Sequence, residues 1–133
     1  MLGLASAVDE NTTITGLIGD LAFYHDMNGL LASGNCKATL VIINNGGGGI
    51  FRYLPQSGLE TFERDWLTPV ELDFQHAASL YRLPFQRVSS VAGFNHAFSQ
   101  SLDQAGVKLI EVLIDAQQSV AQHQAYWDAV SGD

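Results

Sequence analysis

Two apolar runs, each followed by polar residues, constrain the fold of this chain most strongly. The first run, Ile14–Ile18, is followed by Gly19-Asp20. The second run, Leu40–Ile43, is followed by Asn44-Asn45 and then by the glycine tract Gly46–Gly49. Two apolar strands joined by a helical crossover form a βαβ unit, whose strands are parallel and end at the same edge of the sheet. The pattern therefore predicts that the polar residues after both strands meet at the carboxyl edge, where open α/β sheets bind ligands.

The segment between the two runs supplies the crossover that such a unit needs. Residues 27–32, with the sequence MNGLLA, suit a short helix, and Asp26 in front of them is a residue type that caps helix N-termini. His25 beside Asp26 could also form an acid–base pair with it, although a helix cap next to a surface histidine is the more common arrangement. We expect Asp26 to cap the crossover helix, and a catalytic role for the pair stays open.

The rest of the chain continues the alternation of helices and strands. A helix at the N-terminus precedes the first run, and the later elements are recognised from their apolar spacing and caps. They are a helical turn or two within Glu60–Trp66, a helix capped by Asp73, a strand at Phe85–Val88, a helix from Ser89 or Ser90 to about Gln104, a strand at Val107–Ile114 and a helix at Ser119–Val130. This order predicts one α/β domain over residues 1–133, with three layers and a mostly parallel sheet covered by helices on both faces.

Charge and cysteine content exclude several classes of partner. The chain has 14 acidic and 6 basic residues and a net charge of −8, which argues against nucleic acid, because phosphate backbones require Lys and Arg. A diphosphate ligand would need a metal ion to supply positive charge. Cys36 is the single cysteine, so the chain has no disulfide framework and no thiolate cluster for zinc, and a reduced, cytoplasmic compartment is expected. We find no pattern for a signal peptide or a membrane span.

The balance of apolar and charged residues points to a surface that another chain covers. Apolar residues make up 47% of the sequence and charged residues only 15%, which is apolar for an isolated soluble domain. Residues 2–7 resemble the end of a helix that began earlier. We therefore expect a piece of a longer protein that forms a homo-oligomer.

The residues after the two apolar runs suit a hard metal ion. Asp20 and Asn45 both offer side-chain oxygen, and a carbonyl of the glycine tract, most simply that of Gly47, could add a third oxygen for Mg²⁺. Glycines let the backbone approach a ligand closely and adopt positive φ. No lysine follows the tract, so it is not an ATP-binding P-loop.

The glycine tract also has a competing interpretation. Asn-Gly between apolar runs is a signal for a β-hairpin, so residues 40–54 could fold back as an antiparallel ribbon. This stretch alone leaves both possibilities open, and Asp20 at the end of a matching strand favours the metal site. Ile50, Phe51 and Leu54 similarly suit either a core or the wall of an apolar pocket. Glu60, Glu63 and Asp65 are expected to be solvated.

At these residues the sequence resembles a known family. Gly19-Asp20 with Asn44-Asn45 resembles the GD…NN signature of enzymes that use thiamine diphosphate. The wider block GDLAFYHDMNGLL…LVIINNGGGGIFRYLPQ…LDFQHAASLY is similar to the C-terminal, diphosphate-binding domain of 2-succinyl-5-enolpyruvyl-6-hydroxy-3-cyclohexene-1-carboxylate synthase, an enzyme of menaquinone biosynthesis. The similarity covers nearly the whole chain. It departs from the broad signature at Leu21, where that signature has glycine although this family commonly has leucine, and in a short crossover around Ser33–Cys36.

The resemblance implies a cofactor site. Asp20 and Asn45 would bind Mg²⁺ by their side chains, and the Gly47 carbonyl would be the third ligand. Ile50 and Phe51 would flank the thiazolium ring and the substrate, while residues 19, 21 and 22 would lie along the diphosphate. The full set of cofactor-binding residues that the resemblance implies is Gly19, Asp20, Leu21, Ala22, Asn45, Gly47, Ile50 and Phe51.

The resemblance also implies a reaction that this chain does not complete alone. In that family the enzyme decarboxylates 2-oxoglutarate and adds the succinyl-semialdehyde unit to isochorismate, with the cofactor supplying the difficult chemistry. The glutamate that activates the cofactor belongs to an N-terminal, pyrimidine-binding domain, so no catalytic side chain is expected here and the isolated chain is expected to be inactive. Two alternatives remain: a free-standing module that binds a small ligand, and a dimerisation domain without a ligand.

Overall fold

The computed structural model describes residues 1–9, 11–68 and 71–132, with the side chain of Asn35 outside the description. Contacts divide the chain into two compact units. Unit 1 comprises residues 1–44 and 72–113, and unit 2 comprises residues 45–71 and 114–133. The prediction of a single domain over the whole chain stays a prediction.

Unit 1 is built around a four-stranded sheet with the order β1-β2-β4-β3. Its strands are β1 (Ile14–Gly19), β2 (Ala38–Asn44), β3 (Phe85–Val88) and β4 (Val107–Leu113). Every pair of neighbouring strands in this sheet is parallel. The sequence prediction of an α/β fold with a parallel sheet is therefore confirmed. The hairpin alternative is wrong, because β2 lies between two parallel partners and residues 45–54 form no strand.

The crossover between β1 and β2 differs from the sequence prediction at its start. Helix α2 (Asp20–Asp26) begins directly at the end of β1, and the 3-10 helix η1 (Met27–Asn35) continues from it. The prediction that the Asp26 side chain caps this crossover is wrong, since it makes no capping hydrogen bond. The chain is already helical when it reaches Asp26, so this residue is not at the start of the crossover's helical segment.

The caps of the later helices were predicted correctly. Asp73 precedes α4 (Phe74–Leu80) and accepts a hydrogen bond from the Gln75 N–H. Ser90 precedes α5 (Val91–Asp103) and accepts one from the Gly93 N–H. The N-terminal helix is α1 (Leu2–Ala5). A short polar side chain that satisfies an otherwise unpartnered N–H group is the physical basis of such caps.

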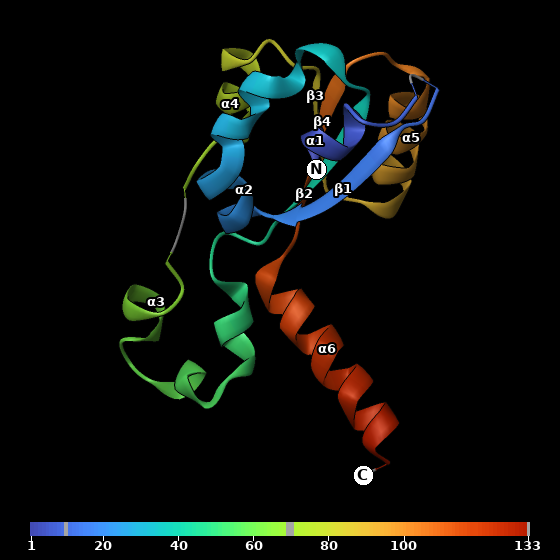
Figure 1. Ribbon diagram of the computed structural model, residues 1–133. Helices are drawn as coiled ribbons and strands as arrows, with labels where there is room; N and C mark the ends of the chain where they lie inside the picture. Colours follow the sequence, from blue (N-terminus) through green and yellow to red (C-terminus); the bar gives the residue numbers. More distant parts are fainter. Residues whose placement is uncertain (10, 69–70, 133) are drawn as a thin grey trace. The chain divides into compact units, whose positions relative to one another are not determined.

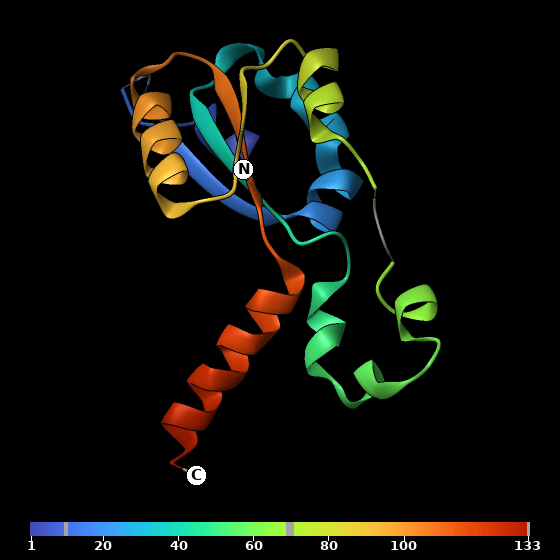
Figure 2. The same ribbon diagram turned by 180° about the vertical axis from the view of Figure 1, so that it is seen from behind.

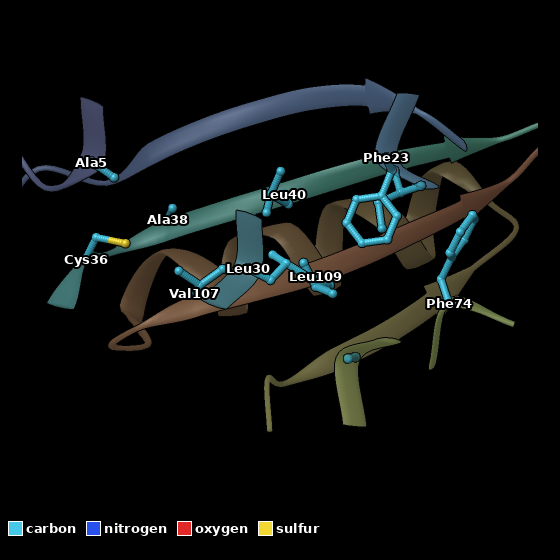
Figure 3. Packing of buried hydrophobic residues seen from close by; sticks show 11 residues of the cluster. Ala5, Phe23, Leu30, Cys36, Ala38, Leu40, Phe74, Val107 and Leu109 are labelled. Atoms are coloured by element: carbon cyan, nitrogen blue, oxygen red, sulfur yellow. The ribbon is translucent and has the colours of Figure 1, made fainter. Parts of the chain in front are cut away.

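Helices cover both faces of the sheet in unit 1, with α2 and α4 on one face and α5 on the other (Figures 1 and 2). The main hydrophobic core lies between β2, β4 and the helices on the α2 side, and its side chains point toward one another in Figure 3. The buried members of this core are Ala5, Phe23, Leu30, Cys36, Ala38, Leu40, Ile42, Phe74, Ala78, Val107 and Leu109. On the opposite face, the Thr39 hydroxyl donates to the Ser101 hydroxyl of α5 over 2.9 Å.

Unit 2 combines short helical turns with one long helix. The turns are the 3-10 helices η2 (Gly49–Tyr53) and η3 (Pro55–Gly58) and the α-helix α3 (Phe62–Asp65). The long helix α6 (Ala116–Ser131) starts earlier than predicted, because Asp115 caps it by accepting a hydrogen bond from the Gln118 N–H over 2.8 Å.

Tyr53 joins the two parts of unit 2. Its hydroxyl lies 3.2 Å from the Ser119 hydroxyl and 3.2 Å from the His123 Nδ1 of α6. Its ring also packs edge-on against Trp127, with the centroids 5.5 Å apart. In the described residues of the whole chain, every helix is too short or too polar to span a lipid bilayer.

Candidate functional site

The register of β1 and β2 brings their carboxyl ends side by side. Gly19, the last residue of β1, pairs with Ile43, and β2 ends one residue later at Asn44. Asp20 therefore follows the last rung of the ladder on one strand. Asn45 follows directly after the end of the other. The convergence of the two strand ends, on which the predicted metal site depends, is confirmed for the strands themselves.

Asp20 is a buried carboxylate at the start of α2. Its side chain is 4% exposed, and its Oδ1 accepts a hydrogen bond from the Leu21 N–H over 2.9 Å. Gly19 and Ala22 are exposed, and Leu21 is half-buried. These four predicted residues form one continuous segment of unit 1 at the carboxyl edge of the sheet.

The other predicted residues belong to unit 2. Among them, Asn45 gives the clearest indication of a bound ligand. The side-chain Oδ1 of Asn45 is buried and has no hydrogen-bond partner among the described residues. An unsatisfied buried carbonyl oxygen is costly, and native proteins rarely leave one without a role. Gly49 lies against the same carboxamide, so a Cβ at position 49 would collide with the Asn45 Nδ2. The lack of a side chain at position 49 therefore provides the space that the Asn45 carboxamide occupies.

Gly47 is a glycine for conformational reasons. Its φ is +128°, and a Cβ there would lie 2.6 Å from the Thr68 carbonyl oxygen and 2.7 Å from that of Leu67. The neighbouring Gly48 N–H donates to the Leu67 carbonyl over 2.5 Å. Residues 47–48 and 67–68 consequently run in close contact, an approach that only side-chain-free backbone permits.

The apolar residues after the glycine tract do not form a buried core. Ile50 is 69% exposed and Leu54 is 40% exposed. Phe51 packs edge-on against Trp66, with the ring centroids 5.7 Å apart. Of the two interpretations that the sequence left open, a core position is wrong for Ile50 and Leu54. The alternative, an apolar surface beside a ligand, stays a prediction.

Other candidates from the sequence lie in exposed positions. His25 and Asp26 are both exposed, as are the acidic residues Glu60, Glu63 and Asp65, which were expected to be solvated. Within the described part of the chain, no group of three or more His, Cys, Asp or Glu side chains is placed to hold a metal ion. A site built from one carboxylate, one carboxamide and one carbonyl would be all-oxygen, the donor set that Mg²⁺ prefers.

Sequence reasoning missed a polar network beside the end of β2. Glu111, in the middle of β4, is fully buried, with one oxygen accepting from the Asn44 Nδ2 over 2.6 Å and the other from the Arg87 Nε. Arg87 also donates to Asp73 over 2.6 Å. The acidic residue in the run VKLIEVL, which is apolar apart from Lys108 and Glu111, was the signal that could have revealed it, because an acid in a buried strand requires a partner.

The network has a clear electrostatic character. Hydrogen bonds to Glu111 and then to Asp73 raise the pKa of Arg87, so this guanidinium stays charged. The hydrogen bond from Arg87, followed by that from the Gln75 N–H, lowers the pKa of Asp73. Arg87 and its two acidic partners therefore form a charge-assisted chain of short hydrogen bonds.

Comparison with known proteins finds relatives that share one name. Relatives named 2-succinyl-5-enolpyruvyl-6-hydroxy-3-cyclohexene-1-carboxylate synthase are 46% identical over 90% of this chain in Haloarcula marismortui and 38% identical over 99% in Lysinibacillus sphaericus. The Staphylococcus aureus relative is 44% identical over 96% of the chain. Nearly the whole chain is thus similar to one region of these synthases. The resemblance drawn from its motifs is thus confirmed, although no family model matches the sequence.

The matched region is a small part of each relative. The chain spans 20% of the Haloarcula synthase and 23% of each of the other two synthases. Solved structures agree on the fold. Benzoylformate decarboxylase from Polynucleobacter necessarius superposes with a TM-score of 0.73 at 22% identity, over 86% of this chain and 22% of that enzyme. Thiamine diphosphate-dependent 4-hydroxybenzoylformate decarboxylase from Rhodococcus jostii gives 0.70 at 25% identity, over 84% and 21%. The thiamine-diphosphate-binding fold predicted from sequence is therefore confirmed.

Proposed function

We propose that this chain is the diphosphate-binding domain of a synthase that uses Mg²⁺ and thiamine diphosphate. The synthase would decarboxylate 2-oxoglutarate and add the succinyl-semialdehyde unit to isochorismate in menaquinone biosynthesis. One observation carries the proposal: β1 and β2 end side by side, one followed by a buried aspartate and the other by an asparagine whose buried Oδ1 has no described partner. The similarity of nearly the whole chain to one region of the synthases supports it.

The donor set of the chain fits the proposed metal. The Asp20 carboxylate, the Asn45 carboxamide oxygen and the Gly47 carbonyl are hard oxygen donors, and Mg²⁺ commonly shares its shell between such protein ligands and substrate phosphates. The metal would also provide the positive charge that a chain of net charge −8 lacks toward a diphosphate. Gly19, with the two residues after Asp20, would lie along that diphosphate.

The remaining residues of the proposed site exclude water and orient the reacting groups. When bound, thiamine diphosphate supplies carbanion stabilisation, which is chemistry that side chains lack. Ile50 and Phe51 would form an apolar surface beside the thiazolium ring and the substrate. Their part in the reaction is to keep water from the reacting centre, where it would compete with the carbon acceptor.

The proposal requires a partner for activity. The activating glutamate is expected in an N-terminal, pyrimidine-binding domain of the same family, and the chain spans about a fifth of the length of its curated relatives. We therefore expect the isolated 133-residue chain to be inactive, because it needs that N-terminal domain as a partner. We also expect the assembled enzyme to be a homo-oligomer. A normal turnover of 2-oxoglutarate and isochorismate by this chain alone would contradict the expectation that activity requires the N-terminal domain.

Calorimetric titration tests the cofactor assignment directly. Thiamine diphosphate should bind the chain in the presence of Mg²⁺ and bind much more weakly without it. Asp20→Ala and the conservative Asp20→Asn should both abolish the Mg²⁺-dependent part. Asp26→Asn, which changes an exposed acid at the other end of α2, is the matched control and should bind as the parent does. Absence of any Mg²⁺-dependent binding by the folded parent would favour a dimerisation domain without a ligand.

Co-expression with an N-terminal half of the enzyme distinguishes a synthase domain from a free-standing binding module. Activity restored by the two halves together supports the proposal. Cofactor binding without activity in the assembled pair supports the module instead.

A further inference from the structure

Glu111 is an unusual residue for its place in the fold. It lies in the middle of β4, paired in register with Ile42 of β2 and Arg87 of β3, and its side chain is fully buried. Burying a carboxylate is expensive, and even a well-paired buried ion pair is commonly no more stabilising than apolar residues of the same volume. A role in stability alone therefore explains this residue poorly.

The two oxygens of Glu111 have different partners. Oε1 accepts from the Asn44 side chain over 2.6 Å, and Oε2 accepts from Arg87. Arg87 in turn reaches Asp73, the residue that caps α4. Glu111 thus connects the last residue of β2 with the first turn of α4, through hydrogen bonds that are all charge-assisted.

Both ends of this network lead to residues of the proposed metal site. At one end, Asn45 is bonded directly to Asn44. Because Asn44 is the last residue of β2, holding its carboxamide fixes the backbone position from which Asn45 departs. At the other end, Phe74 at the start of α4 packs edge-on against Phe23 of α2, with ring centroids 5.1 Å apart (Figure 3). Asp20 is the first residue of α2.

We propose that Glu111 is a positioning residue for the Mg²⁺ site: its hydrogen bond to Asn44 orients the end of β2 so that the Asn45 carboxamide is presented to the metal. Arg87 holds Glu111 in place by occupying its second oxygen. This inference rests on the proposed function. It goes beyond it by assigning a metal-orienting role to a strand residue outside the GD and NN motifs.

The decisive experiment exchanges donor and acceptor between the two residues. Glu111→Gln removes the charged acceptor of the Asn44 hydrogen bond. Asn44→Asp removes the donor and places a second carboxylate next to that of Glu111. Each single variant should weaken Mg²⁺-dependent binding of thiamine diphosphate by roughly 10- to 100-fold, the usual effect of removing a group that orients a metal ligand. In the double variant, which combines Asn44→Asp with Glu111→Gln, the new amide at position 111 would donate to the new carboxylate at position 44. Binding should then return to within a few-fold of the parent.

A control variant separates positioning from the general effect of altering a buried charge. Lys108 is 2% exposed on the same strand, and its Nζ donates to the carbonyls of Gln104 and Gly106 near the opposite end of β4. Lys108→Met changes a buried charge without touching Asn44, so its cofactor affinity should match that of the parent. Equal loss of affinity in Lys108→Met and Glu111→Gln, or no recovery in the double variant, would overturn the inference.

A second measurement does not depend on cofactor binding. Hydrogen exchange followed by NMR should show slow exchange of the Asn44 carboxamide protons and the backbone amides of residues 44–47 in the parent. Glu111→Gln should accelerate exchange there about tenfold or more, with residues 107–110 changing much less. Unchanged exchange at residues 44–47 would reject the role of Glu111 even if the parent binds cofactor well. If the parent fails to bind cofactor while exchange responds as expected, the proposed function fails and the orienting contact stands.

Discussion

Single glycines after β2 restrict the chain in two different ways. Gly47 is required by its backbone, because a φ of +128° is strained for any residue with a Cβ. Gly49 is required by space, because its backbone carries no such strain and the Asn45 carboxamide fills the place of a side chain. A substitution at position 49 therefore acts on one side chain of the proposed metal site with little effect on the surrounding fold.

We expect Gly49→Ala to weaken Mg²⁺-dependent binding of thiamine diphosphate by roughly tenfold or more, because the new methyl group displaces the Asn45 carboxamide. Its unfolding midpoint in urea should change little. Gly58→Ala is the control, since a Cβ there meets nothing within 4 Å. Titration of the two variants side by side checks the prediction. Equal affinity for thiamine diphosphate in both would contradict the assignment of Asn45 to the metal site.

Asp73 gives a pH dependence with a defined sign. Its pKa is lowered in the folded chain, first by the hydrogen bond from Arg87 and then by the Gln75 N–H. A carboxyl group with a depressed folded pKa stabilises the fold above its unfolded pKa, about 3.9, and loses this contribution as the pH falls through the folded pKa. Asp73→Asn should therefore be less stable than the parent near neutral pH, and the difference should shrink below about pH 4.

Urea unfolding of the parent and Asp73→Asn at about pH 7 and about pH 3 measures this difference. Arg87→Gln should remove the same pH-dependent part, because it deletes the other partner of the ion pair. A stability difference between Asp73→Asn and the parent that is as large at the lower pH as at the higher would contradict this assignment.

At the scale of elements, an aromatic contact joins α2 and α4. Phe74 is 2% exposed and packs edge-on against the equally buried Phe23. We expect Phe74→Ala to lower the free energy of unfolding by about 3–5 kcal/mol, because the substitution leaves a cavity against the sheet. Leu80→Ala at the other end of α4 removes a side chain that is 71% exposed and should cost less than about 0.5 kcal/mol. Chemical denaturation of both variants checks the contrast.

Most helices and strands were predictable from local sequence signals. The prediction was wrong where a local signal conflicted with the conformation of the preceding segment. Apolar runs predicted β1, β2, β3 and β4, and the caps Asp73 and Ser90 were identified correctly, because each depends on a few neighbouring residues. The start of α2 was missed because Asp26 looked like a cap while the chain had already become helical at Asp20.

For the candidate site, sequence alone placed residues at strand ends but did not identify the side chains that hydrogen-bond to the neighbouring residues. The pairing of Glu111 with Asn44 and Arg87 joins three strands, and such contacts arise from strand order, which periodicity does not encode. The sequence left open whether Ile50 is a core residue or lines a pocket, for a similar reason. Hydrophobicity ranks a residue as suited to burial without saying whether another segment comes to cover it.

At the scale of the whole molecule, the apolar surface of β1 predicts self-association. In the described residues β1 pairs with β2 alone, and Leu17 on this strand is 74% exposed. Sheet edges with exposed apolar side chains favour pairing with other chains. The isolated chain should therefore show concentration-dependent sedimentation, and Leu17→Lys should shift it toward monomer. Leu31→Lys, at an 84% exposed position in η1, is the charge-matched control and should not. Monomeric behaviour of the parent at all concentrations would contradict this prediction.

The two-part composition of unit 2 affects how the chain can form during synthesis. Residues 45–71 leave the ribosome well before residues 114–133, with which they make one compact unit. Tyr53 in particular is separated by 66 residues from Ser119. The segment that follows β2 thus lacks its contacts with α6 until α6 has emerged from the ribosome, whereas β1 and β2 can pair much earlier. This unit is consequently completed only after α6 has been synthesised.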